Sequence, residues 1–196
     1  MSAPHTFAQR YLGTFLRPGR TFEALSEHRA LRSAIGAVLS AAMVYSAFVL
    51  WMYATGHQPS FTGNPIPAEH YYLWQAIFLP PWLLVAWAAY ASAAHGLSRL
   101  FGSTATWPAT AAPLGFALAV PLTWSYLIPE MLVFGLAGHG ALVTAMRITG
   151  PLTLIWWSVL TWKALRSTHE QSRLASAAIT FVALLALIAV TAVLVR

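Results

Sequence analysis

The sequence predicts an all-α fold: a polytopic membrane helix bundle of about five transmembrane helices, preceded by a short amphipathic N-terminal helix. Three observations lead to this prediction. Only 8% of the 196 residues are charged and 58% are apolar, with a mean hydropathy of +0.63, whereas about a quarter of the residues of a soluble domain are charged. The apolar residues gather in five stretches long enough to cross a bilayer. Most Lys and Arg residues lie at the ends of these stretches that would be on the same side of the membrane.

A transmembrane helix needs about 20 mostly apolar residues. On this basis the chain divides into a cytoplasmic amphipathic segment, 1–32, and one membrane domain, 33–196, with spans at about 33–55, 71–97, 108–128, 141–162 and 174–195. Pro80 and Pro81 should kink the second span, because each proline removes a backbone donor. The third span is expected to end near Pro129-Glu130, and the pattern leaves open whether 131–140 is a loop or a re-entrant segment. The fourth is the least apolar of the five.

The distribution of basic residues predicts the orientation. With five spans, one side of the membrane receives Arg10, Arg17, Arg20, Arg29, Arg32, Arg99, Lys163, Arg166 and Arg173, and the other receives only Arg147 and Arg196. Lys and Arg are in excess in cytoplasmic loops. We therefore expect a cytoplasmic N-terminus and an external C-terminus, and we interpret the net charge of +6 as topology and not as affinity for nucleic acid.

Residues 5–16 carry an apolar stripe at helical spacing that includes Phe7, Tyr11 and Phe15. Such a helix lies either in the lipid interface or against the cytoplasmic end of the bundle, and the pattern favours neither. After the break at Pro18-Gly19, a second short helix is expected to bear Phe22 and Leu25.

Several segments resemble a known family. The run from Phe15 to Leu25, with Pro18-Gly19 and Phe22, is similar to the proline–phenylalanine motif before the first span of bacterial Yip1-domain proteins. Leu100-Phe101-Gly102-Ser103, then Trp107 and 111–121, resemble that family's Gly-containing loop and third helix. The resemblance implies about five spans and a cytoplasmic N-terminus. The Asp-Leu-aromatic-Gly-Pro motif of the eukaryotic members cannot occur here, because the chain has no Asp, so their role in traffic and Rab binding is not implied.

Ionisable groups inside a membrane are costly and are functional candidates by default. Three qualify here: Glu130, Arg147 and His95. Glu130 and Arg147 flank the expected outer loop, where they form either an ion pair or two separate interfacial groups, with the Arg147 guanidinium reaching outward. His95 is either a proton relay or a group that satisfies a neighbouring backbone carbonyl.

The outer side also gathers residues that can ligate zinc or copper. They are His57, His70, His139 and Glu130, with Glu69 nearby. No two of them have the spacing of two ligands on one helix. The interpretation is therefore either a metal site or solvated loop residues, and we expect no cofactor.

Small residues at four-residue spacing let helix backbones approach closely. Ala111, Gly115 and Ala119 form such a stripe in the third span, and Gly36 and Ser40, with Ala37 and Ala41, form another in the first. They predict tight helix pairs within the bundle or between protomers. Four tryptophans fall too deep for an interfacial belt: Trp82, Trp87, Trp156 and Trp157. They pack between helices, face lipid or form the wall of a binding pocket, and we favour packing.

With no Cys, no Asp and five Glu, thiolate chemistry is excluded and paired-carboxylate chemistry nearly so. We therefore expect that the protein is not an enzyme. The leading hypothesis is an integral membrane scaffold or interaction protein of the bacterial inner membrane, which assembles with itself or with other membrane subunits among the membrane lipids. The alternative is a transporter- or channel-like protein for a small solute, ion or lipid, which the prolines within the spans favour.

Overall fold

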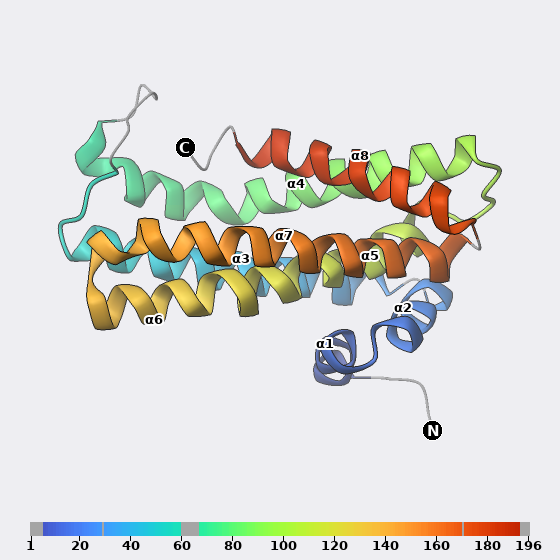
Figure 1. Cartoon of the computed structure of the whole chain (residues 1–196), viewed down its shortest axis with the longest axis horizontal. Helices are drawn as coiled ribbons and strands as arrows, with labels where there is room; N and C mark the ends of the chain where they lie inside the picture. Colours follow the sequence, from blue (N-terminus) through green and yellow to red (C-terminus); the bar gives the residue numbers. More distant parts are fainter. Residues whose placement is uncertain (1–5, 29, 60–66, 170, 193–196) are drawn as a thin grey trace.

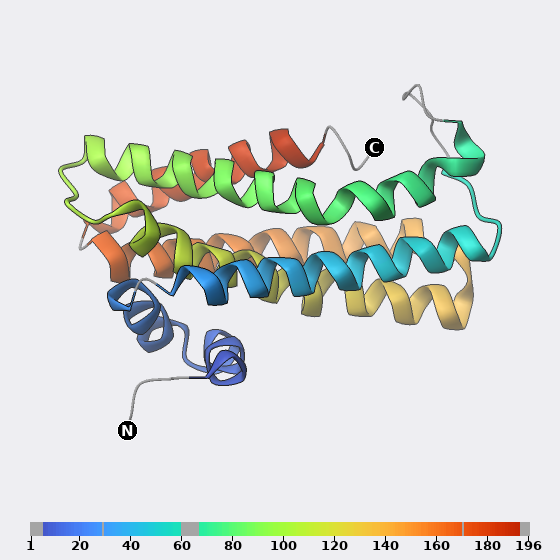
Figure 2. The same ribbon diagram turned by 180° about the vertical axis from the view of Figure 1, so that it is seen from behind.

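The computed structural model describes residues 6–28, 30–59, 67–169 and 171–192, and every regular element within these ranges is helical. The elements are α1 (Phe7–Leu16), α2 (Pro18–Glu27), α3 (Leu31–Ala54), η1 (Ala68–His70), α4 (Tyr71–Leu100), α5 (Trp107–Pro121), η2 (Leu122–Leu127), α6 (Ile128–Ala137), α7 (His139–His169) and α8 (Arg173–Thr191). The long helices lie side by side in one bundle, with α2 against one end of it and α1 beside α2, nearer the middle (Figure 1, Figure 2). The predicted all-α bundle is confirmed.

Four helical stretches in the described part of the chain are long and apolar enough to cross a membrane: Leu31–Ala54, Ala68–Leu100, Trp107–Ala137 and Arg173–Thr191. The protein is therefore a multi-pass membrane protein. The predicted fourth span, 141–162, lies inside α7, which is 31 residues long but more polar than these four. Figure 1 shows α7 running the length of the bundle beside them. Arg29, Arg196 and the predicted end of the fifth span at 193–195 lie outside the described residues.

Helix α4 continues without interruption through Pro80 and Pro81 and bends along its length in both views (Figure 1, Figure 2). A proline inside a helix leaves the carbonyl four residues earlier without its usual donor. For Pro80 this is the carbonyl of Ala76, and the hydroxyl of Ser46 on α3 donates to it at 2.9 Å. A neighbouring helix thus supplies the hydrogen bond that the proline removes, as a membrane interior requires.

The third span does not end near Pro129-Glu130. A π-helical segment, η2, joins α5 directly to α6, which continues to Ala137. Residues 131–137 are therefore helical, and the chain reverses at Gly138, whose φ of +75° is readily adopted only by glycine. Pro129 is tolerated because the π-helix already interrupts the i→i−4 hydrogen-bond pattern just before it.

Close packing of small residues joins α3 to α5. Ala111 and Ala119 are fully buried, and a side chain added at Gly115 would place its Cβ 2.8 Å from the Cβ of Ala34. The predicted stripe of the third span therefore packs within the bundle. The first-span stripe is divided: Ala37 and Ala41 are fully buried, whereas Gly36 lies against the ring of Phe7 and Ser40 is exposed.

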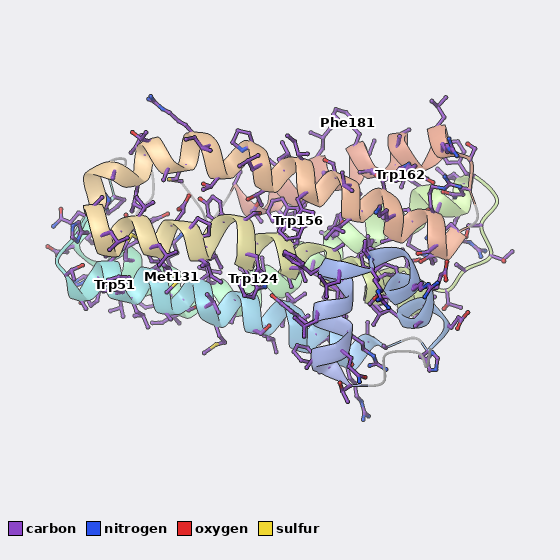
Figure 3. All side chains as sticks on the ribbon, turned by 60° about the horizontal axis from the view of Figure 1, so that its bottom comes forward. Trp51, Trp124, Met131, Trp156, Trp162 and Phe181 are labelled. Atoms are coloured by element: carbon purple, nitrogen blue, oxygen red, sulfur yellow. The ribbon has the colours of Figure 1, made fainter. Side chains whose placement is uncertain are left out.

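Of the two positions predicted for the N-terminal helix, the structure shows the one against the bundle. Phe7 contacts Phe116 of α5, with ring centroids 6.0 Å apart, and Phe15 contacts Trp156 of α7, with centroids 5.1 Å apart. Figure 3 shows Trp156 and Trp124 beside α1. In α2, Phe22 and Leu25 are fully buried, as their pattern predicts.

Candidate functional site

A row of side chains on one face of α7 makes polar contacts along the bundle. The residues are spaced by four, so that they lie one above another on the helix. The Thr153 hydroxyl bonds with that of Ser125, the indole N–H of Trp157 donates to the carbonyl of Leu118 at 2.9 Å, and the Thr161 hydroxyl bonds with that of Tyr90. With Thr149, which reaches α6, these residues form a polar ladder: Thr149, Thr153, Trp157 and Thr161.

Glu130 lies at one end of this ladder. Its side chain is only 3% exposed, and its Oε1 accepts a hydrogen bond of 2.9 Å from the Thr149 hydroxyl. Arg147 is exposed and forms no ion pair with Glu130 among the described residues. The reason is register: residues two apart on a helix do not share a face, so Arg147 points away from the side on which Thr149 meets the carboxyl.

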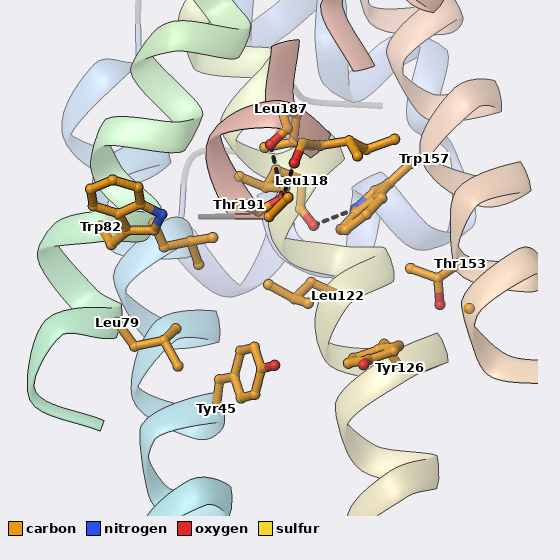
Figure 4. A pocket seen from close by; sticks show the side chains of 14 residues that line it. Tyr45, Leu79, Trp82, Leu118, Leu122, Tyr126, Thr153, Trp157, Leu187 and Thr191 are labelled. Carbon is orange, nitrogen blue, oxygen red and sulfur yellow. Dashed lines mark hydrogen bonds between the residues drawn. The ribbon is translucent and has the colours of Figure 1, made fainter. Parts of the chain in front are cut away.

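Two half-open cavities in the bundle share Tyr45 and Tyr126 as a common wall. We call them the outer cavity, which contains Glu130, and the inner cavity, which contains Trp157. The rings of Tyr45 and Tyr126 approach edge to face, with centroids 6.5 Å apart. Figure 4 shows these two tyrosines on one side of the inner cavity and Leu187 and Thr191 of α8 on the other.

The outer cavity has a volume of about 270 Å³ and a partly polar wall. Four tyrosines line it, together with Gln75, Glu130 and His139: Tyr45, Tyr71, Tyr72 and Tyr126. Gln75 is 6% exposed, and its Oε1 is buried without a hydrogen-bond partner among the described residues. A buried acceptor without a donor is unfavourable, so this wall is suited to a ligand that donates hydrogen bonds.

The inner cavity is about 280 Å³ and largely apolar. Its wall comes from α3, α4, α5, η2, α7 and the last turns of α8. The indole N–H of Trp82 donates to the carbonyl of Val190 at 3.1 Å and so fixes the end of α8 against α4. Three of the four deep tryptophans thus donate hydrogen bonds between helices: Trp82, Trp157 and Trp87, whose N–H donates to the carbonyl of Ala111.

The structure divides the predicted metal candidates. The rings of His57 and His139 lie close together, with centroids 5.0 Å apart, whereas His70 contacts Glu69 at 3.7 Å. His139 and Glu130 both line the outer cavity. Over the described ranges, no three His or Glu side chains are grouped closely enough to hold a metal ion.

A second polar cluster lies at the opposite end of the bundle. His95 contacts the Thr110 hydroxyl at 3.2 Å, Thr110 contacts Nε2 of His169 at 3.2 Å, and Ser103 contacts Nδ1 of His169 at 2.6 Å. His169 lies beyond the predicted span 141–162, and its burial, with a smaller contribution from His95, lowers its pKa from 6.5 to about 4. Sequence reasoning found His95 but missed His169, Ser103 and Thr110, because they come from three separate segments.

Comparison with known proteins identifies the family. No curated protein and no solved structure matches the chain. The model of the Yip1 domain family matches residues 12–195, which includes α2, all the long helices and both cavities. This chain therefore belongs to the Yip1 domain family.

Proposed function

We propose that the protein is a scaffold or interaction protein of the bacterial cytoplasmic membrane, which assembles with itself or with other membrane subunits. The observation that carries the proposal is an open groove of about 470 Å³ between α7 and α8. Small side chains lie in the groove, including Ser158 and Ala177, and larger ones stand beside it. Figure 3 shows Phe181, which is 65% exposed, projecting from the outside of the bundle.

Helices associate in membranes where small residues let the backbones approach closely. The stripe containing Gly115 is already used inside the bundle. The α7–α8 groove places small side chains, among them Ser158 and Ala177, on the outside of the bundle, where a transmembrane helix of a second copy or of another subunit can lie.

The orientation in this proposal has the α2 end in the cytoplasm, with five helices crossing. Support comes from the bundle itself, because α7 runs its full length (Figure 1). The segments that carry Arg17, Arg20, Arg99, Lys163 and Arg173 all lie at the α2 end, as expected for a cytoplasmic end.

Cysteine cross-linking tests the groove directly, because the chain has no cysteine of its own. In native membranes, Ala177→Cys is expected to capture a second copy or a partner helix, whereas Ala47→Cys, exposed on α3, serves as the matched control. Ala177→Trp should fill the groove and abolish assembly while leaving the monomer folded. A protein that is monomeric in native nanodiscs and is captured no better through residue 177 than through residue 47 would refute the proposal.

The divided interior favours a transporter-like protein as the second candidate. A rotation of the Tyr45 and Tyr126 rings would join the outer and inner cavities, since both rings line both spaces. Thr153→Cys, in the wall of the inner cavity, would then react with a membrane-impermeant maleimide added outside. If it stays unreactive while the exposed control His70→Cys is labelled, the interior is closed to water and transport is disfavoured.

A further inference from the structure

The two cavities that meet at Tyr45 and Tyr126 differ in chemistry in a way that defines one kind of ligand. The outer cavity presents oxygen acceptors: the carboxyl of Glu130 and the unpartnered amide oxygen of Gln75. The inner cavity presents apolar side chains, among them Leu83, Leu118 and Leu187. A molecule that fills both must have a hydrogen-bond-donating head and an apolar tail.

The head group is best matched by a primary ammonium. It supplies three donors and no acceptor, which suits a wall with a buried carboxyl and a Gln75 amide oxygen that lacks a donor. Aromatic rings attract cations, and four tyrosines surround this space. An anionic head group is disfavoured, because the described residues that line either cavity include no Lys or Arg.

The space suits a single chain. The two cavities have volumes of about 270 and 280 Å³, and together they fall within the usual range for small-molecule sites, about 300–1,000 Å³. The inner cavity lies between α4, α7 and α8, which are helices that also face the outside of the bundle. A membrane-dissolved amphiphile can therefore approach from the bilayer.

We infer that the protein binds an amphiphile with a primary ammonium head and one alkyl chain. The ammonium lies in the outer cavity between Glu130 and Gln75, and the chain passes Tyr45 and Tyr126 into the inner cavity. An ammonium beside Glu130 forms an ion pair within the protein, where neither charge meets lipid. This inference does not depend on the α7–α8 groove and would stand if the proposed assembly failed.

Calorimetric titration of the protein in phosphatidylcholine nanodiscs, with empty nanodiscs as the blank, tests the inference. The probe is decylammonium, and decanol and decyltrimethylammonium have the same chain but lack the charge or the N–H donors. We expect saturable binding of decylammonium, weaker binding of decyltrimethylammonium, and the weakest binding of decanol. Because hydrogen bonds to charged groups exceed neutral ones, Glu130→Gln should weaken decylammonium binding about tenfold or more.

Matched variants separate binding from folding. Glu69→Gln removes an exposed carboxyl at the same end of the bundle, outside the cavity lining, and should not change affinity. Gly150→Leu should block the chain, since Gly150 lines the inner cavity and an added Cβ meets nothing within 4 Å. Gly140→Leu, on the same helix with equally open space, is its control. Size-exclusion profiles establish that each variant is folded, and Gly150→Leu tests the site even if Glu130→Gln fails to fold.

Equal affinity for decylammonium and decanol, or equal effects of Glu130→Gln and Glu69→Gln, would overturn the inference. So would unchanged binding in Gly150→Leu. Repeating the titration in nanodiscs that contain lysophosphatidylethanolamine, a lipid with a primary ammonium and one chain, identifies the source of the ammonium. Competition by that lipid supports an aminophospholipid as the occupant, and unchanged decylammonium affinity supports a free amine.

Discussion

Two glycines with the same sequence pattern should respond in opposite ways to replacement by alanine. At Gly115 the added Cβ would lie 2.8 Å from the Cβ of Ala34 and 3.2 Å from Nε1 of Trp87, compared with about 3.5–4.0 Å for optimal carbon contacts. Trp87 cannot move aside freely, because its N–H donates to the carbonyl of Ala111. At Gly36 the nearest atom is in the Phe7 ring at 3.5 Å, an ordinary contact.

The magnitude follows from these distances. Both substitutions gain about 1 kcal/mol of helix propensity, so this contribution cancels when the two variants are compared. Overpacking at Gly115 costs about 1–3 kcal/mol, and Gly36 has no such cost. Gly115→Ala should therefore be less stable than Gly36→Ala by about 1–3 kcal/mol, roughly a 5- to 150-fold difference in the unfolding constant.

Reversible unfolding by sodium dodecyl sulfate in mixed micelles, followed by far-ultraviolet circular dichroism, measures the difference. Wild-type protein provides the reference, and Gly36→Ala should unfold at the same or a higher detergent fraction. If both variants unfold at the same fraction, the close approach of α3 and α5 at Gly115 is not what stabilises this pair of helices.

Three further predictions concern hydrogen bonds and pH. Ser46→Ala should destabilise the protein by about 0.6–1.7 kcal/mol. The loss of stability should be smaller in a Pro80→Ala background, because residue 80 then has a backbone N–H that can donate to the carbonyl of Ala76. Equal losses in both backgrounds would contradict this prediction. In a double-mutant cycle in mixed micelles, Thr161→Val and Tyr90→Phe should show a coupling free energy of about 0.6–1.7 kcal/mol. Additive effects of the two substitutions would mean that the two hydroxyls do not interact. The lowered pKa of His169 means that the unfolded chain takes up a proton before the folded one, so stability should fall as the pH drops from about 6.5 to about 4. Melting temperatures of wild-type and His169→Gln protein across this window test the effect, which should be smaller in the variant.

Hydropathy and periodicity predict the fold well because a membrane helix is apolar both where it faces lipid and where, like α5, it is buried among other helices. They predict α3, α4 and the start of α5 closely, and they place Phe22 and Leu25 in a buried second helix. They do not predict that α5 continues into α6, since Pro121 and Pro129 are helix-breaking signals on their own. The π-helical segment η2 accommodates both prolines, and no local sequence pattern predicts a π-helix there.

The candidate site was only partly predictable for a related reason. Glu130 stands out in the sequence as a carboxyl within an apolar stretch. Its partner does not, because the choice between Arg147 and Thr149 depends on the rotation of α7 about its axis. Gln75 and the tyrosines reach the outer cavity from α3, α4 and η2, and their convergence depends on how those helices cross.

Helix α7 shows why composition underestimates some membrane helices. Its polar ladder faces inward, and each hydroxyl or indole of the ladder has a partner on another helix: Glu130, Ser125, Leu118 and Tyr90. Its opposite face is apolar, with Leu152, Ile155 and Val159 exposed. Averaging over the helix mixes the two faces and lowers the mean hydropathy, and Arg147, exposed in the first half of α7, lowers it further. A helix of this kind is suited to a membrane only when its neighbours supply the partners, so the position of α7 depends on the rest of the bundle more than that of α3 or α8 does.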